Sequence, residues 1–188
     1  DTPLISYRDQ NHSLMIEKII QKLDAGLDLT LISDAGTPLI SDPGYKLVKQ
    51  LRDLNYEVIS IPGASAVTSA LSISGLPTDK FIFLGFLPKS DVKRHKLIEQ
   101  YKDKDVTMVI YESPNRLMRL LYLMGDILGF DCKCFLAKDI SKIREENIYG
   151  SIKDVLDILE EKDFEKSPHG EFVCVLNNKV SKEKGENS

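Results

Sequence analysis

Along the chain, segments whose hydrophobic residues recur at helical spacing alternate with short continuous hydrophobic runs. Apolar residues at helical spacing predict helices over residues 14–25, 45–54, 64–73, 89–102, 116–128 and 152–161. Short apolar runs predict strands over residues 29–32, 57–61, 81–86, 106–111, 133–137 and 171–176, with a further short segment beginning at Ile148. Strands that alternate with helices of this length are typical of parallel βαβ units, so the pattern predicts an α/β fold.

A run of turn-forming residues, Ser-Gly-Leu-Pro-Thr-Asp-Lys at positions 74–80, interrupts this alternation. We expect it to separate an N-terminal lobe, residues 1–76, from a C-terminal lobe, residues 77–178, each a sheet flanked by helices. The polar residues 179–188 are expected to form a disordered tail. A ligand is expected in the cleft between the lobes, where strands end.

Composition and charge narrow the class of protein. The 188 residues are 42% hydrophobic and 29% charged, which is typical of a globular protein. A formal charge of −4 argues against nucleic-acid binding over the whole surface, but it leaves room for a local basic patch. The three cysteines form neither a disulfide framework nor a CxxC pair, the histidines are isolated, and no apolar run is long enough to cross a membrane. We therefore expect a soluble protein of the reducing cytoplasm, without a metal site.

The loop over residues 33–38, Ser-Asp-Ala-Gly-Thr-Pro, follows the strand predicted over residues 29–32. It lacks both the Gly-Lys-Ser/Thr ending of a P-loop and the spacing of a dinucleotide-binding turn. Because it contains an acid and no base, it suits sugar hydroxyls or a positively charged ligand better than phosphate. The alternative is a plain turn. Further on, Asp42 and Pro43 are expected to cap the next helix.

Three more segments carry candidate chemistry. Residues 61–66, Ile-Pro-Gly-Ala-Ser-Ala, form a turn whose small side chains let another backbone or a flat ring approach closely. Glu112 and Arg116 lie on either side of a helix start at Pro114. They either form a simple ion pair or bind a hydroxyl or phosphate of a substrate. The basic run from Lys89 to Lys96 is either a solvated helix face or a contact surface.

Together these segments resemble one known family. The strings SDAGTPLISDPGY, IPGASA, SGLPTDKF with GFLP, YESPNR and GEFV stand in the order and spacing of the ribosomal RNA small subunit methyltransferase I family, a branch of the tetrapyrrole methylase (class III) superfamily. The resemblance covers residues 1–177, and the long first string is its most specific part. There are two departures. The family's opening strand and Pro-x-Gly-Asn-Leu loop are not in this sequence, and its Arg-Glu-Leu-Thr-Lys stretch reads Lys-Asp-Ile-Ser-Lys at positions 138–142.

The resemblance implies a two-lobed tetrapyrrole-methylase-like fold with S-adenosyl-L-methionine in the cleft between the lobes, and usually a homodimer. It implies methyl transfer to the ribose 2′-hydroxyl of a cytidine in 16S rRNA, presented as RNA or as an assembled 30S particle. Carried over position by position, it assigns cofactor binding to Asp34, Gly36, Thr37, Ser65, Ala66, Tyr111 and Ala137.

A ribose hydroxyl is a weak nucleophile, so a group that orients or deprotonates it should help. Glu112 is the candidate for that role, with Arg116 or Lys142 positioning a phosphate, and Lys93, Arg94 and Lys96 are expected to contact the RNA. Two alternatives stay open. One is a superfamily relative that methylates a tetrapyrrole or a protein-bound small group, and the other is an inactive binding or dimerisation fragment.

Overall fold

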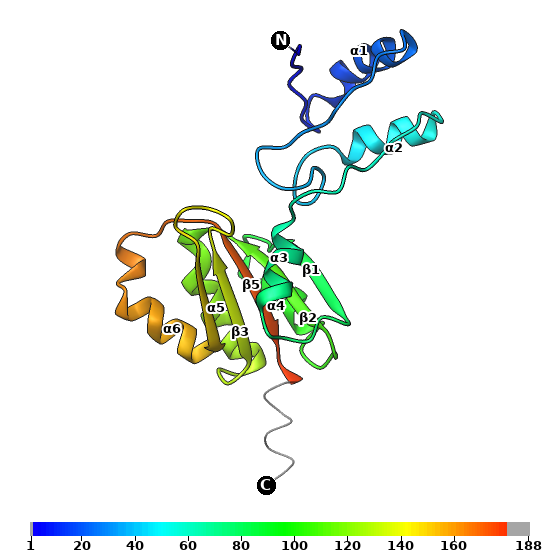
Figure 1. Ribbon diagram of the computed structural model, residues 1–188. Helices are drawn as coiled ribbons and strands as arrows, with labels where there is room; N and C mark the ends of the chain where they lie inside the picture. The colour runs from blue at the N-terminus through cyan, green and yellow to red at the C-terminus, as the bar shows by residue number, and fades with distance from the viewer. Residues whose placement is uncertain (1, 180–188) are drawn as a thin grey trace. The chain divides into compact units, whose positions relative to one another are not determined.

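The structure is a computed structural model that describes residues 2–179 (Figure 1). Contacts divide the chain into two compact units, one up to Ser65 and one from Ala66 onward. The division falls earlier than the lobe boundary expected after Leu76, because helix α3 (Ala66–Ile73) packs on the sheet of the second unit. The tail expected over residues 179–188 lies outside the described residues except for Lys179. No helix within residues 2–179 is long and apolar enough to cross a membrane.

The first unit consists of two helices and long connecting loops. Helices α1 (His12–Asp24) and α2 (Tyr45–Asp53) pack through a small buried cluster of Ile16, Ile19 and Leu47. A polar bridge reinforces this contact, because His12 Nε2 lies 2.7 Å from Gln50 Oε1 and His12 Nδ1 lies 2.9 Å from the Tyr7 hydroxyl. These contacts fix α1 against α2.

The segments expected as strands over residues 29–32 and 57–61 belong to no sheet among the described residues. Their apolar side chains remain exposed, with Ile32 at 71% and Ile61 at 78%. A strand is stabilised by a neighbour whose backbone N–H and C=O groups complete the hydrogen-bond ladder, and residues 2–65 place no such neighbour beside either segment. The expectation of a sheet in each lobe is therefore wrong for the first unit as described, and the α/β class rests on the second unit.

The second unit is built on a five-stranded sheet in the order β1-β2-β5-β3-β4. Neighbours β1 and β2 are parallel, as expected for βαβ units, but β5 is antiparallel to both β2 and β3, and β4 is antiparallel to β3. The sheet is therefore mixed rather than parallel throughout. Because β5 reverses direction between them, β2 and β3 point the same way, so β1, β2 and β3 all end at one edge. The strands are β1 (Phe81–Phe86), β2 (Thr107–Glu112), β3 (Lys133–Lys138), β4 (Glu146–Ser151) and β5 (Phe172–Asn177).

Helices cover both faces of this sheet (Figure 1). Helix α3 lies over one face, where Val109, Phe135 and Val173 are buried. The other face is covered by α4, α5 and α6, and a short 3-10 helix, η1, follows α6. Successive side chains of a strand point to opposite faces, so chain neighbours on β2 enter different cores. The helices are α4 (Asp91–Glu99), α5 (Pro114–Leu128), α6 (Ile152–Glu161) and η1 (Phe164–Lys166).

Two helix starts show how local chemistry sets the element boundaries. Helix α6 begins with a capping box, in which Ser151 Oγ accepts the Asp154 N–H and the Asp154 carboxylate accepts the Ser151 hydroxyl and N–H. The bond from the Ser151 hydroxyl lowers the pKa of Asp154. Helix α2 starts differently from the expectation. Its N-cap is Gly44, at φ 134°, whose N–H donates to Asp9 Oδ1 at 3.2 Å, so Asp42 is not the cap.

The three cysteines are buried. Burial raises the pKa of the Cys134 and Cys174 thiols, so neither is a ready nucleophile at neutral pH. Cys132, Cys134 and Cys174 therefore act as small core side chains.

Candidate functional site

The two glycine-containing loops of the first unit lie against each other. Thr37 Oγ1 donates a hydrogen bond to the Ala64 carbonyl at 2.9 Å. Gly36 has φ 73°, and a Cβ at this position would lie 3.7 Å from the same carbonyl oxygen. Ser33 Oγ donates to the carbonyls of Ala35 and Gly36, each at 3.2 Å, which holds the first loop in its turn. The motifs at residues 33–38 and 61–66 therefore form one structural feature.

Asp34 stands at the tip of this feature. Its side chain is exposed and makes no hydrogen bond or ion pair with any residue between positions 2 and 179. A carboxylate without a protein partner has all its acceptor capacity available to a ligand. Ser65 follows Ala64 directly and ends the first unit, half-buried. The first unit thus contributes Asp34, Gly36, Thr37 and Ser65 from two touching loops.

The other predicted cofactor residues belong to the second unit, where Tyr111 and Ala137 lie in one row of the sheet and Ala66 begins α3. Val173 on β5 pairs with Tyr111 on β2 and with Ala137 on β3, so the latter two flank it on the same face. Because β5 lies between their strands, Tyr111 and Ala137 are two strand spacings, or about 10 Å, apart along the sheet. Ala137 is fully buried, and the half-buried Tyr111 ring stands edge-on to Phe83 with 4.8 Å between centroids. Ala66 packs against the buried cluster to which Ala137 and Val173 belong, as does Tyr111.

Val173 is a further candidate that the sequence reasoning did not name. It lies in the Gly-Glu-Phe-Val motif at positions 170–173, but a valine in an apolar strand has no chemistry of its own. Its place beside Tyr111 and Ala137 follows from the order of the strands, which puts β5 between β2 and β3.

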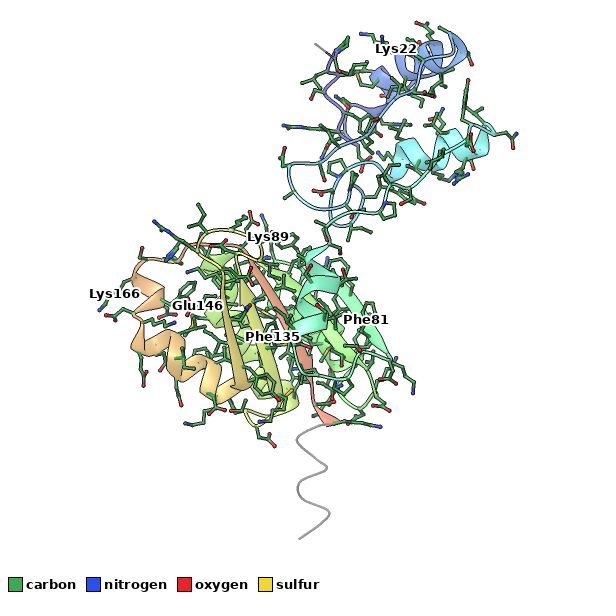
Figure 2. All side chains as sticks on the ribbon, in the orientation of Figure 1. Lys22, Phe81, Lys89, Phe135, Glu146 and Lys166 are labelled. Carbon is green, nitrogen blue, oxygen red and sulfur yellow. The ribbon has the colours of Figure 1, made fainter. Side chains whose placement is uncertain are left out.

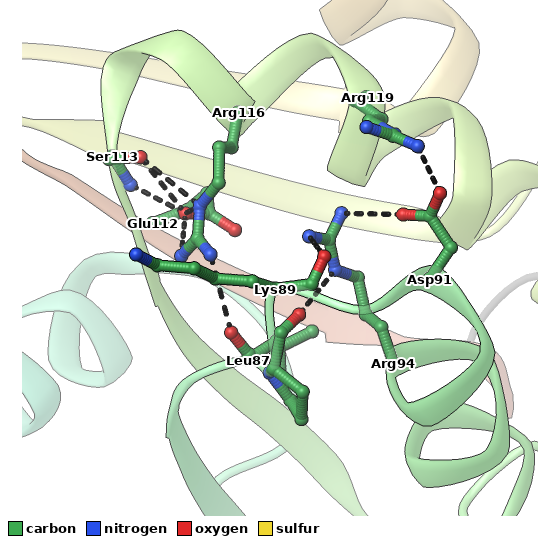
Figure 3. A network of polar contacts seen from close by, with 9 residues as sticks. Leu87, Lys89, Asp91, Arg94, Glu112, Ser113, Arg116 and Arg119 are labelled. Atoms are coloured by element: carbon green, nitrogen blue, oxygen red, sulfur yellow. Dashed lines mark hydrogen bonds and ion pairs between the residues drawn. The ribbon is translucent and has the colours of Figure 1, made fainter.

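Glu112 follows Tyr111 in the chain and therefore points to the opposite face, toward α5 (Figure 3). Its side chain is fully buried. Glu112 Oε1 accepts the Ser113 N–H at 2.7 Å and Arg116 Nε–H at 2.7 Å, and Arg116 Nη2 lies 2.6 Å away. Its Oε2 is buried and has no hydrogen-bond partner within residues 2–179. The carboxylate is thus engaged in an ion pair at the start of α5, whose first residue is Pro114, as expected.

Lys142 lies in the loop after β3 and is partly exposed. Its Nζ is 2.7 Å from Glu171 Oε2, and this hydrogen bond raises the pKa of Lys142. The loop is fixed to the chain before β5, because Asp139 N–H donates to the Glu171 carbonyl at 2.9 Å and Glu171 N–H donates to Asp139 Oδ1 at 3.0 Å. Since β2 and β3 end at the same edge, Lys142 and Glu112 lie at that edge with β5 between them.

The basic run at the start of α4 divides into two kinds of residue. Lys89, Lys93 and Lys96 are exposed, but Arg94 is only 1% exposed. Arg94 Nε donates to the Pro88 carbonyl at 3.1 Å and its Nη2 reaches the Lys89 carbonyl at 3.5 Å. The expectation that Arg94 contacts RNA does not fit this burial, because its guanidinium holds the β1–α4 loop from inside.

Two further features lie away from these residues. A small hollow between β3, β4, α6 and η1 has an apolar floor that includes Leu136 and Phe172, and Lys138 and His169 stand at its rim. It contains none of the predicted site residues. Among residues 2–179 no three His, Cys, Asp or Glu side chains gather closely enough to hold a metal ion.

Comparison with solved structures supports the fold. The methyltransferase CobJ superposes on 94% of this chain and 74% of its own, with a TM-score of 0.63 and 14% identity. Uroporphyrin-III C-methyl transferase from Thermus thermophilus, in a complex with S-adenyl homocysteine, covers 91% of this chain and 75% of its own, with a TM-score of 0.57 and 14% identity.

Sequence comparison is more specific. The chain is 38% identical over 175 residues to Ribosomal RNA small subunit methyltransferase I of Synechocystis sp., covering 93% of this chain and 61% of that relative. It is 38% identical over 177 residues to the protein of the same name from Thermotoga maritima, covering 94% of this chain and 77% of that relative. It thus spans about three fifths to three quarters of the length of these two relatives.

The family described as Tetrapyrrole (Corrin/Porphyrin) Methylases matches residues 3–162. Because the family matches most of the chain and the chain is 38% identical to the Thermotoga maritima protein, it belongs to the tetrapyrrole methylase family, in the branch of ribosomal RNA small subunit methyltransferase I.

Proposed function

We propose that this chain carries the methyl-transfer site of an S-adenosyl-L-methionine-dependent enzyme that methylates the ribose 2′-hydroxyl of a cytidine in 16S rRNA. The observation that carries the proposal is the 38% identity, over more than nine tenths of the chain, to proteins named Ribosomal RNA small subunit methyltransferase I. The proposed setting is the cytoplasm. The substrate is the RNA or the assembled 30S particle, and the enzyme works as a homodimer.

The residues present fit the proposed cofactor. When bound, S-adenosylmethionine would supply a methyl group on a positively charged sulfur, and that sulfur would leave as the neutral thioether of S-adenosylhomocysteine as an oxygen nucleophile bonds to the methyl carbon in line. Asp34 offers a carboxylate without a protein partner for ribose hydroxyls or for that charge. Gly36 leaves space beside the Ala64 carbonyl, where a side chain would narrow the approach. We assign cofactor contacts to these loops and to the row of Tyr111, Val173 and Ala137.

The remaining residues are proposed to place the acceptor. Alignment of donor and acceptor supplies much of the rate of an in-line transfer. Arg116 and Lys142 both lie at the edge where β1, β2 and β3 end, and both are partly exposed, so a phosphate at this edge can reach them. Glu112 is buried with one oxygen fully used by Ser113 and Arg116. We therefore propose Glu112 as a positioning residue for Arg116 rather than as the group that removes the hydroxyl proton.

A product analysis tests this function. The chain is incubated with S-adenosylmethionine carrying a tritiated methyl group and with small-subunit particles or protein-free 16S rRNA, and the RNA is then digested with alkali. Alkaline cleavage needs a free 2′-hydroxyl, so we expect the label in an alkali-resistant dinucleotide that begins with cytidine. Label in a base, in protein or in an added tetrapyrrole acceptor would contradict the proposal and would favour the alternative acceptors.

A further inference from the structure

Three exposed lysines lie at the start of α4 and just before it. Lys93 and Lys96 are three residues apart within α4, which puts them on one side of the helix, and Lys89 lies in the loop just before the N-cap Ser90. All three are exposed, and none makes an ion pair with a residue between positions 2 and 179. We name these three residues the lysine stripe.

The backbone under the stripe is held by two arginines from different helices (Figure 3). Arg116 on α5 reaches the Leu87 carbonyl at 3.5 Å, and Arg94 on α4 bonds the carbonyls of Pro88 and Lys89. Three successive carbonyls of the β1–α4 loop therefore face guanidinium groups. Arg116 is itself fixed by the buried Glu112 carboxylate. This arrangement sets the position of Lys89 relative to α4 before any ligand binds.

The acid that begins α4 already has cationic partners. Asp91 accepts a hydrogen bond from Arg119 and lies 3.8 Å from Arg94 Nη1. The stripe therefore keeps its positive charge uncompensated in a chain with a formal charge of −4.

Three lysines near the end of the second unit, on or beside α6 and η1, are each paired with an acid. Lys153 bonds Asp157 on α6, and Lys166 bonds Asp163 beside η1, at 2.9 and 2.7 Å. Lys162 likewise pairs with Glu146. Figure 2 shows Lys89 at one end of the sheet and Lys166 beyond α6.

We propose that the lysine stripe binds the phosphate backbone of the RNA substrate, an inference that rests on the proposed function. A lysine is a flexible point charge suited to phosphate contact without reading bases. The place of the stripe, directly after β1, lies at the edge of the sheet that also carries Arg116 and Lys142. The stripe thus orients RNA toward that edge.

Matched triple variants test the stripe. The probe is a fluorescein-labelled RNA stem–loop with unpaired cytidines in its loop, and its binding to the whole chain is followed by anisotropy over a range of salt concentrations. Lys89→Gln/Lys93→Gln/Lys96→Gln should weaken binding about ten- to a hundredfold near 0.1 M salt and lower the slope of log K against log salt by about 2. The control Lys153→Gln/Lys162→Gln/Lys166→Gln removes the same charge from α6 and η1 and should leave the slope unchanged.

Equal slopes for the two triple variants would overturn the proposal, and so would an unsubstituted chain that does not bind the probe. Binding of S-adenosylhomocysteine to the same proteins separates this result from the proposed function. Retained cofactor binding with equal slopes means that only the stripe is wrong. Lost RNA affinity in the stripe variant, from a chain that binds no cofactor, supports the stripe and counts against the methyl-transfer site.

Discussion

Replacing Arg116 with methionine should lower the free energy of unfolding by about 3–5 kcal/mol. Arg116 contributes Nε and Nη2 to the Glu112 carboxylate, whose side chain is fully buried. Without the guanidinium, that carboxylate keeps only Ser113, and its Oε2 already has no hydrogen-bond partner among residues 2–179. The cost therefore comes from the buried charge left behind, and urea unfolding followed by circular dichroism measures it.

The chain offers a matched control one turn further along α5. Arg119 also pairs with a carboxylate, that of Asp91, but its side chain is 67% exposed. Arg119→Met should therefore cost less than about 1 kcal/mol. The double variant Glu112→Gln/Arg116→Met should recover about 1 kcal/mol or more of the loss, because it removes the buried charge. Equal losses for Arg116→Met and Arg119→Met would show that the Glu112 pair does not stabilise the unit as we argue.

The second large effect is expected at Arg94. Arg94→Met keeps an apolar stem in the core but removes the donors to two carbonyls of the β1–α4 loop, and we expect a loss of about 2–3 kcal/mol. Amide hydrogen exchange in the segment after β1 should also accelerate. The neighbouring variant Lys93→Met changes an exposed side chain and should stay within about 0.5 kcal/mol. A loss at Lys93 as large as that at Arg94 would contradict the assignment of Arg94 to the interior.

The burial of Arg94 could not be predicted from the sequence. In the sequence Arg94 is one of four Lys and Arg residues between positions 89 and 96, and a charge run usually marks a solvated face. Its burial follows from the approach of the loop to α4, which no local pattern contains. The helices are different, because their spacing of apolar residues and signals such as Ser113-Pro114 are local, and the expected α5 and α6 are confirmed within one or two residues.

The sheet was predictable in its parts and not in its order. Strands β1, β2, β3 and β5 lie in apolar runs that indicate strands, whereas β4 is mostly polar and was expected only as a short segment from Ile148. The place of β5 between β2 and β3 depends on contacts distant in sequence. The segments over residues 29–32 and 57–61 have the same apolar character and belong to no sheet among the described residues, because a strand requires a partner. Alternation along β2 could have separated Tyr111 from Glu112, since neighbours on a strand face opposite sides.

The most direct test of the methyl-donor site is a calorimetric titration of S-adenosylhomocysteine into the chain and into Asp34→Ala. We expect micromolar binding that weakens about tenfold or more in the variant, because a hydrogen bond to a charged group contributes about 1.5–3 kcal/mol. Asp28→Ala, another exposed aspartate of the first unit, is the control and should bind as the unsubstituted chain does. Absent binding, or binding that Asp34→Ala leaves unchanged, would contradict the assignment of the cofactor to the loop at residues 33–38.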